Sequence, residues 1–182
     1  MKALIVIDFV YDFVANDGKL TAGKPAQAID ENIAKIVANF NKNNDIIIVA
    51  SDSHTENDPD NIESKLFPPH CIKGTKGCEL FGKTKTAVEK CDKKNVFHIE
   101  KQRYSAFSGT SLDSVLRKRN IKDIYLVGVC SDICVLHTAV DAYNLGCNIN
   151  VYEKGIASFN PEGHAFALNH LKNSLGASII KI

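Results

Sequence analysis

The feature that most constrains the fold is a set of short apolar runs rich in isoleucine and valine. Five runs stand out and a sixth is weaker: 3–7, 46–50, 96–99, 124–129, 149–152 and 177–182. Their apolar residues are mostly continuous rather than alternating, which is typical of strands buried on both faces. The runs therefore predict a parallel sheet that is covered by helices on both sides.

Helical patterns separate these runs. Apolar residues recur at helical spacing from Ile29 to Phe40, after Pro25, which is a favourable first-turn residue. Further patterns cover 112–116 with Ser111 as a candidate cap, 133–145 closed by Gly146, and 161–171 opened by Pro161 and ended by Gly176. Because strands and helices alternate throughout, we expect an α/β fold, a three-layer α/β/α arrangement with a mostly parallel six-stranded sheet. No linker interrupts the pattern, so residues 1–182 are predicted to form a single domain.

Composition and charge exclude several classes of partner. The net charge of +1 gives no electrostatic reason to expect nucleic acid or a membrane surface. No apolar run approaches the roughly 20 residues of a membrane helix. The first run ends at Asp8 without a cleavage site, so it is interpreted as a strand rather than a signal peptide. We therefore expect a cytoplasmic protein whose six cysteines are reduced thiols.

Polar residues follow four of the runs. These residues are Asp8, Asp52, Lys101 and the turn from Cys130 to Cys134. Each has an ordinary explanation by itself, as a turn cap, a solvated charge or a small buried hydrophobe. The carboxyl ends of parallel strands, however, share one edge of the sheet, where ligands bind. The coincidence predicts a functional site at this edge.

Three of these groups suit acyl transfer from an amide. Cys134 begins a predicted helix, where the helix dipole and the nearby ammonium of Lys101 would favour a thiolate. Asp8 could take the thiol proton and return it to a leaving amine. Since one lysine compensates only one negative charge, Asp8 and Cys134 would share a proton. The Cys134 N–H and a second N–H from the preceding turn would form an oxyanion hole.

A second group of polar residues lies in the segment from 52 to about 85, which has little regular pattern. A stretch of this length is usually functional or disordered. It contains Asp52, His54, Glu63 and His70. Two imidazoles and up to two carboxylates suit zinc, iron or manganese. A polar loop with incidental histidines is an equally good interpretation of the loop alone.

Together with the blocks at 104–110 (YSAFSGT) and 128–135 (GVCSDICV), these residues resemble the isochorismatase-like cysteine hydrolases, and within them the nicotinamidase/pyrazinamidase group. The likeness covers essentially the whole chain. The resemblance implies that Asp8 is the general base, that Lys101 stabilises charge and that Cys134 is the nucleophile. It also implies a cis peptide bond before Cys130, whose N–H would then join that of Cys134 in the oxyanion hole.

The resemblance also implies the remaining site residues. Asp52, His54 and His70 match the family's metal ligands, and Glu63 fits a fourth ligand used by part of the family. One divalent transition metal ion, zinc before iron or manganese, would bind the pyridine nitrogen of the substrate. The ring would be flanked by two aromatic residues with two weaker wall candidates: Phe13 and Tyr104, then Leu20 and Phe67.

The implied function is hydrolysis of nicotinamide, and of pyrazinamide, through a Cys134 thioester in NAD salvage. The partner is then a small pyridine carboxamide, and relatives of this kind are commonly homo-oligomers. One alternative is another amidohydrolase of the same superfamily, acting on a carbamoyl or ureido substrate, for which the metal site would be the discriminator. A second alternative is a catalytically silent metal-binding module, which the intact Asp8, Lys101 and Cys134 disfavour.

Overall fold

A single sheet of six strands runs through the molecule in the order β3-β2-β1-β4-β5-β6. The computed structural model describes residues 1–181, so residue 182 of the last predicted run lies outside the described residues. Every pair of neighbouring strands is parallel, which confirms the α/β prediction and makes the sheet entirely parallel. The strands are β1 (Ala3–Ile7), β2 (Ile46–Asp52), β3 (Val96–Lys101), β4 (Asp123–Val129), β5 (Asn148–Ala157) and β6 (Ser178–Ile180).

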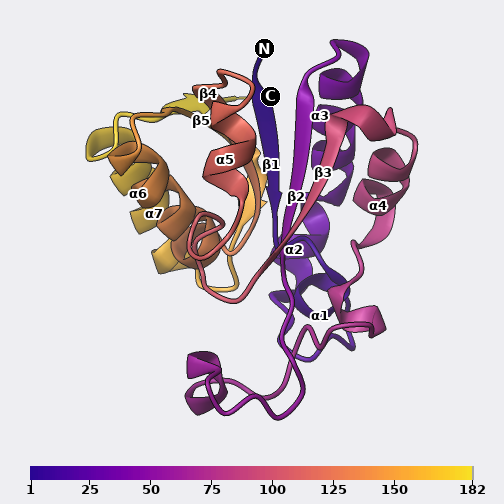
Figure 1. The fold of residues 1–182 in the computed structure, drawn as a ribbon. Coiled ribbons are helices and arrows are strands. Elements are labelled where there is room, and N and C mark those ends of the chain that lie inside the picture. The colour runs from indigo at the N-terminus through magenta and orange to yellow at the C-terminus, as the bar shows by residue number, and fades with distance from the viewer. Residues whose placement is uncertain (182) are drawn as a thin grey trace.

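Helices cover both faces of the sheet, as predicted (Figure 1). One face packs against α5 (Leu112–Arg117), α6 (Leu136–Asn144) and α7 (Pro161–Asn173). The other packs against α1 (Tyr11–Val14), α2 (Gly23–Ala28), α3 (Asp30–Lys42) and α4 (Gly82–Glu89). Short 3₁₀ turns are η1 (Ile62–Lys65), η2 (Lys76–Cys78) and η3 (Lys93–Asn95), and η4 (Ser131–Val135) is a π-helical turn. Among the helices within residues 1–181, none combines the length and apolar character needed to cross a bilayer.

Strand β1 lies at the centre of the core and shows why the apolar runs are continuous. Ala3, Ile5 and Ile7 point into the cluster beneath α5, α6 and α7. Leu4 and Val6 point into the opposite cluster beneath α1 to α4. All five side chains are fully buried. Neither face of the strand meets water, so no polar residue interrupts it.

The predicted helix from Pro25 to Phe40 is two helices, so that prediction was wrong at its start. Pro25 is the third residue of α2, and a separate helix, α3, begins at Asp30. The predicted stripe on α3 is confirmed, since its apolar residues are buried against the sheet. The break leaves the Asp30 carboxylate free to accept hydrogen bonds from the N–H groups of Lys83 and Thr84, both at 2.8 Å. Asp30 therefore caps the first turn of α4.

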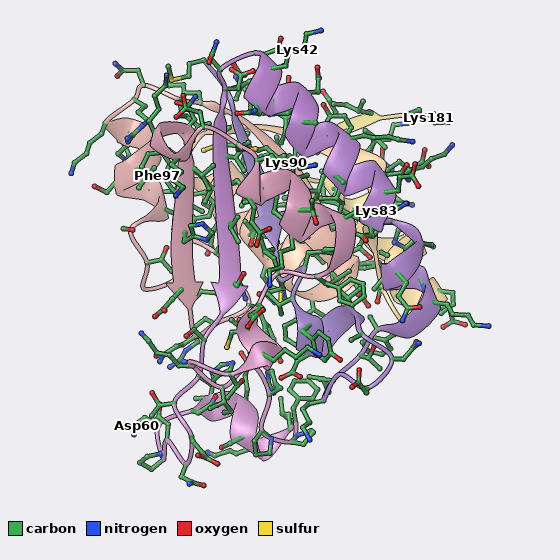
Figure 2. All side chains as sticks on the ribbon, turned by 90° about the vertical axis from the view of Figure 1, so that its right-hand side faces the viewer. Lys42, Asp60, Lys83, Lys90, Phe97 and Lys181 are labelled. Carbon is green, nitrogen blue, oxygen red and sulfur yellow. The ribbon has the colours of Figure 1, made fainter. Side chains whose placement is uncertain are left out.

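The segment from 52 to 85 is less irregular than its sequence suggests. It contains η1 and η2, and α4 begins within it at Gly82. Solvated lysines such as Lys83 in helix α4 and Lys90 directly after it obscure the apolar period of this helix (Figure 2). Asp60 marks the far tip of the loop in the same view. Ser111 is the N-cap residue of α5, as predicted, but its side chain makes no capping hydrogen bond, and Thr110 Oγ1 accepts the Leu112 N–H at 3.2 Å.

Replacing Asp30 with alanine tests the cap that joins α3 to α4. The variant leaves the first N–H groups of α4 without their acceptor, and losses of this kind cost about 0.5–2 kcal/mol of folding free energy. Urea unfolding should show that loss. Asp113→Ala is the matched control, since Asp113 bonds only to the exposed Arg117 at 2.7 Å, and such surface pairs contribute about 0.5 kcal/mol or less. Equal unfolding midpoints for the two variants would contradict the capping role.

Candidate active site and metal centre

The carboxyl ends of four neighbouring strands carry the polar residues singled out from the sequence. Asp52 and Lys101 are the last residues of β2 and β3, Asp8 follows β1, and Cys134 lies on the turn that follows β4. The order β3-β2-β1-β4 makes these strands neighbours. All four side chains are buried, with exposed fractions from 0% to 7%. The structure thus brings the predicted acids, ammonium and thiol to one edge of the sheet.

Lys101 lies between the other groups. Its ammonium is 2.6 Å from Asp8 Oδ2 and 3.8 Å from Cys134 Sγ, and it also pairs with Asp52 Oδ1. Asp8 and Cys134 are therefore both direct neighbours of this ammonium. One buried cation therefore serves two carboxylates as well as the sulfur.

The backbone fixes Asp8 from several sides. Asp8 adopts a left-handed conformation with φ of 52°, and its N–H donates to the Ala50 carbonyl at 2.9 Å. Its Oδ1 accepts the Asp52 N–H at 2.8 Å. Strand β4 approaches closely at Gly128, where a Cβ atom would overlap the carbonyl oxygen of Ile7. These contacts hold the Asp8 carboxylate between the Asp52 N–H and the Lys101 ammonium.

Burial has the largest effect on the pKa values of Asp8 and Cys134. It raises the pKa of Asp8 to about 7, with the charge of Asp52 adding to the rise and Lys101 opposing it. Burial also raises the pKa of the Cys134 thiol well above its usual range, against the opposing charge of Lys101. The helix start and Lys101 were expected to favour a thiolate at Cys134, with one proton shared with Asp8. In the structure, burial outweighs the charge of Lys101 and favours the protonated thiol. The thiol holds its proton beside a carboxylate that titrates near neutrality.

The turn that carries Cys134 departs from the predicted helix start. The peptide bond between Val129 and Cys130 is cis, as the resemblance implied. The π-helical turn η4 follows, and regular α-helix begins only at Leu136. Ser131 is fully buried, and its Oγ lies 2.8 Å from His164 Nδ1 on α7. This contact attaches the turn that carries Cys134 to helix α7.

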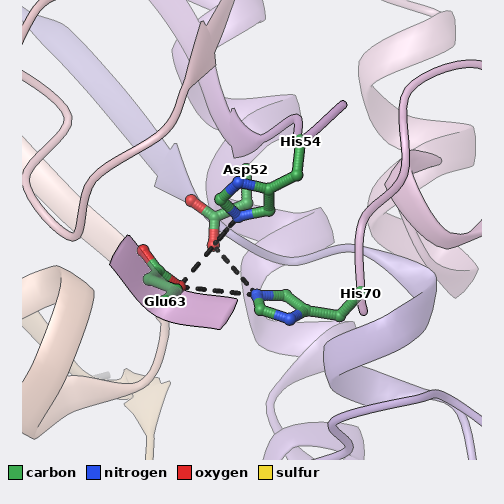
Figure 3. A group of neighbouring side chains, drawn as sticks. All are labelled: Asp52, His54, Glu63 and His70. Carbon is green, nitrogen blue, oxygen red and sulfur yellow. Dashed lines mark ion pairs between the residues drawn. The ribbon is translucent and has the colours of Figure 1, made fainter. Parts of the chain in front are cut away.

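Four buried side chains converge next to Asp8, Lys101 and Cys134. They are Asp52, His54, Glu63 and His70 (Figure 3). One ligand atom from each lies within 4.8 Å of the others. His54 Nε2 is 3.8 Å from Asp52 Oδ2, and His70 Nε2 is 3.5 Å from Glu63 Oε2. Donor atoms about 2.1 Å from a shared ion in a tetrahedral arrangement lie about 3.4 Å apart. The separations fit one ion.

The hydrogen-bonding pattern of this cluster also fits a transition metal ion. His54 Nε2, His70 Nε2 and Glu63 Oε1 are buried without a hydrogen-bond partner, a rare condition in proteins. His70 Nδ1 lies 2.8 Å from the Pro68 carbonyl. That bond assigns the ring proton to Nδ1 and leaves the Nε2 lone pair for a metal. Two imidazoles and two carboxylates form a donor set that zinc, iron or manganese accepts.

A cavity of about 190 Å³ is lined by Cys134 and by three residues of the metal-ligand cluster, Asp52, Glu63 and His70. Cys130 lines this cavity. So do all four wall residues expected from the resemblance: Phe13, Leu20, Phe67 and Tyr104. Sequence reasoning missed Thr21, Val129, Ile133 and Phe159, which also line it. A larger hollow of about 790 Å³ lies beside α4, but Cys134 does not line it. The smaller cavity is therefore the candidate substrate site.

The wall residue Tyr104 is held in place by the helix beneath it. Thr138 is fully buried on α6, and its Oγ1 accepts the Ala106 N–H at 2.9 Å. The Tyr104 ring meets the His137 ring edge-on at a centroid distance of 5.3 Å. The His137 ring is exposed. No periodicity in the sequence marks Thr138 as the anchor of this loop.

These groups together can perform nucleophilic acyl transfer on a small planar substrate. A thiol faces a carboxylate that can accept its proton, and a buried ammonium lies within reach of both. A metal-ligand cluster and aromatic side chains border the same cavity.

Comparison with known proteins places the chain in a family. The model of the isochorismatase domain matches residues 2–181. The chain is 53% identical, over 98% of each sequence, to the uncharacterized isochorismatase family protein PncA of Bacillus subtilis (strain 168). It resembles the crystal structure of a pyrazinamidase/nicotinamidase from Streptococcus mutans UA159, with a TM-score of 0.96 and 55% identity over 99% of this chain and 100% of that one. The pyrazinamidase of Pyrococcus horikoshii in complex with zinc gives a TM-score of 0.85 at 27% identity, over 100% and 99% of the two chains. The chain belongs to the isochorismatase family of hydrolases.

Proposed function

We propose that this chain is a nicotinamidase that hydrolyses nicotinamide, and also pyrazinamide, to the carboxylate and ammonia. One observation carries the proposal: Cys134, which neighbours the Asp8–Lys101 pair, lines the same small apolar cavity as Asp52, Glu63 and His70 of the metal-ligand cluster. Relatives described as pyrazinamidase/nicotinamidase support it. We place the reaction in the cytoplasm, in NAD salvage, which agrees with six free thiols.

The reaction begins at the Cys134 sulfur. As the sulfur attacks the carboxamide carbon, its proton passes to the Asp8 carboxylate. The carbonyl electrons move to oxygen, and we assign the N–H groups of Cys130 and Cys134 as donors to that oxyanion. Collapse of the tetrahedral adduct breaks the carbon–nitrogen bond while Asp8 returns the proton to the leaving nitrogen. The products of this half are ammonia and a thioester on Cys134.

Water completes the turnover. Asp8, again a carboxylate, takes a proton from a water molecule that attacks the thioester carbon. The thiolate leaves and recovers the proton from Asp8, which restores the resting state. Lys101 keeps its charge throughout, since the pKa of its ammonium is raised well above its usual range: burial alone would lower it, but Asp8 and the neighbouring anions outweigh burial.

The metal-ligand cluster determines which substrates fit. We propose that Asp52, His54, Glu63 and His70 hold one divalent ion, with zinc favoured by the zinc-bound relative. When bound, such an ion would supply a Lewis-acid partner for a pyridine nitrogen. The cavity walls add flat aromatic surface from Phe13 and other side chains. A single-ring heteroaromatic carboxamide satisfies both features.

The sibling carbamoyl amidohydrolases are the main alternative. A carbamoyl amino acid carries a carboxylate, which a binding site would normally meet with a cation. Among the residues that line the described cavity, none is lysine or arginine. The absence of a basic side chain from the cavity wall favours an uncharged substrate.

Replacing Cys134 with alanine tests the nucleophile. The variant should release no ammonia from nicotinamide above the uncatalysed rate, because no thioester can form. Cys147→Ala is the matched control, since Cys147 is a free thiol that does not line the cavity and should retain full activity. Normal turnover by Cys134→Ala would end the proposal.

Replacing Glu63 with glutamine tests the fourth ligand. The amide keeps the size of the side chain and removes its charge, so zinc affinity should fall about 10-fold or more. Competition with a chromogenic chelator would measure the dissociation constant. Glu56→Gln, in the same loop but outside the cluster, should leave affinity unchanged. Unchanged affinity in Glu63→Gln would remove Glu63 from the ligand set.

The raised pKa of Asp8 predicts a pH profile. Asp8 accepts the thiol proton only when ionised, and its pKa is about 7. The ratio kcat/KM should therefore rise with pH to a plateau above neutrality, and at pH 5 it should be about 100-fold below that plateau. Metal content is measured at each pH so that metal loss is scored separately. A flat profile between pH 5 and 8 with metal retained would contradict the assignment of Asp8.

A further inference from the structure

We propose that Asp12 is a positioning residue. Its buried carboxylate holds the segment that contains the metal ligand His70 next to the segment that contains Leu20, which forms part of the wall of the substrate pocket. Asp12 lies on α1, is 7% exposed and is absent from both the cavity lining and the ligand cluster. No motif or periodicity in the sequence marks Asp12. The effect on substrate rests on the proposed function, whereas the effect on metal binding does not.

The Asp12 carboxylate joins two segments that are distant in the sequence. Its Oδ2 accepts the Cys71 N–H at 2.7 Å, and its Oδ1 accepts the Lys19 N–H at 3.2 Å. Its backbone carbonyl accepts the Leu20 N–H at 3.1 Å. Cys71 directly follows His70, and Leu20 lines the cavity. One side chain therefore sets the spacing between a metal ligand and a wall of the pocket.

The segment held by Asp12 also contacts the other histidine. The His54 N–H donates to the Cys71 carbonyl at 2.9 Å, and the Lys73 N–H donates to the His54 carbonyl at 2.9 Å. Cys71 itself has a left-handed φ of 46°, a conformation that a non-glycine residue keeps only where its surroundings fix it. Asp12 supplies the hydrogen bond on the side opposite His54. Loss of that bond would loosen His70 relative to His54.

The surroundings of Asp12 match a carboxylate rather than an amide. Two backbone N–H donors point at its two oxygens, and an asparagine would present its own NH₂ group to one of them. No basic side chain in residues 1–181 forms an ion pair with Asp12. Gly77 closes the other side, where a Cβ atom would overlap the carboxylate. This enclosure fixes the carboxylate in one orientation.

The test compares Asp12→Asn with Asp45→Asn. Asp45 is a matched control, since it is 8% exposed and accepts the Lys2 N–H at 3.2 Å, but it precedes β2 at the opposite edge of the sheet. Zinc affinity is measured by chelator competition, KM and kcat by ammonia release from nicotinamide, and Tm by thermal unfolding. Gly77→Ala, which leaves Asp12 in place but presses on its carboxylate, is measured in parallel.

We expect Asp12→Asn and Gly77→Ala to lower zinc affinity about 10-fold or more, and to raise KM by a larger factor than they lower kcat once zinc is saturating. Asp45→Asn should lower Tm but leave zinc affinity and KM within about twofold. If Asp12→Asn fails to fold, Gly77→Ala decides the outcome. Unchanged zinc affinity and KM, with only Tm lowered, would overturn the proposal. If the wild type leaves nicotinamide intact, the proposed function fails and zinc affinity still tests Asp12.

Discussion

The buried ammonium of Lys101 is the interaction on which the rest of the site depends. It is 1% exposed and pairs with two carboxylates, Asp8 and Asp52, that are themselves buried. A buried charge without partners would cost several kcal/mol, so removing any one of the three would destabilise the other two. The three residues end neighbouring strands. The site and the alignment of the strand ends therefore stabilise each other.

Asp52 connects the two halves of the site. Its Oδ1 pairs with Lys101, and its Oδ2 faces the imidazoles of His54 and His70 at 3.8 and 4.0 Å. The charge of Asp52 also contributes to the raised pKa of Asp8. Because the carboxylate is shared, the charge at the cluster acts directly on Asp8. In the mechanism that we propose, metal binding and activation of Cys134 would therefore be electrostatically coupled.

The fold and the chemical groups of the site were predictable because each follows from a local rule. Continuous Ile/Val runs predicted the strands, and the edge rule for parallel sheets brought Asp8, Lys101 and Cys134 together. Features that depend on long-range contacts were not predictable. Asp12 and the wall residue Phe159 show no periodicity, and α4 is obscured by its lysines. The protonated thiol follows from the depth of burial, which a sequence does not give.

A crystal structure of the zinc-loaded protein with nicotinate bound, with anomalous data collected at the zinc edge, would locate the metal and the substrate relative to Cys134. We expect one anomalous peak among Asp52, His54, Glu63 and His70. We also expect the ring nitrogen to face that peak and the carboxylate to face the Cys134 sulfur. A metal peak elsewhere, or nicotinate bound away from Cys134 and Lys101, would contradict this arrangement.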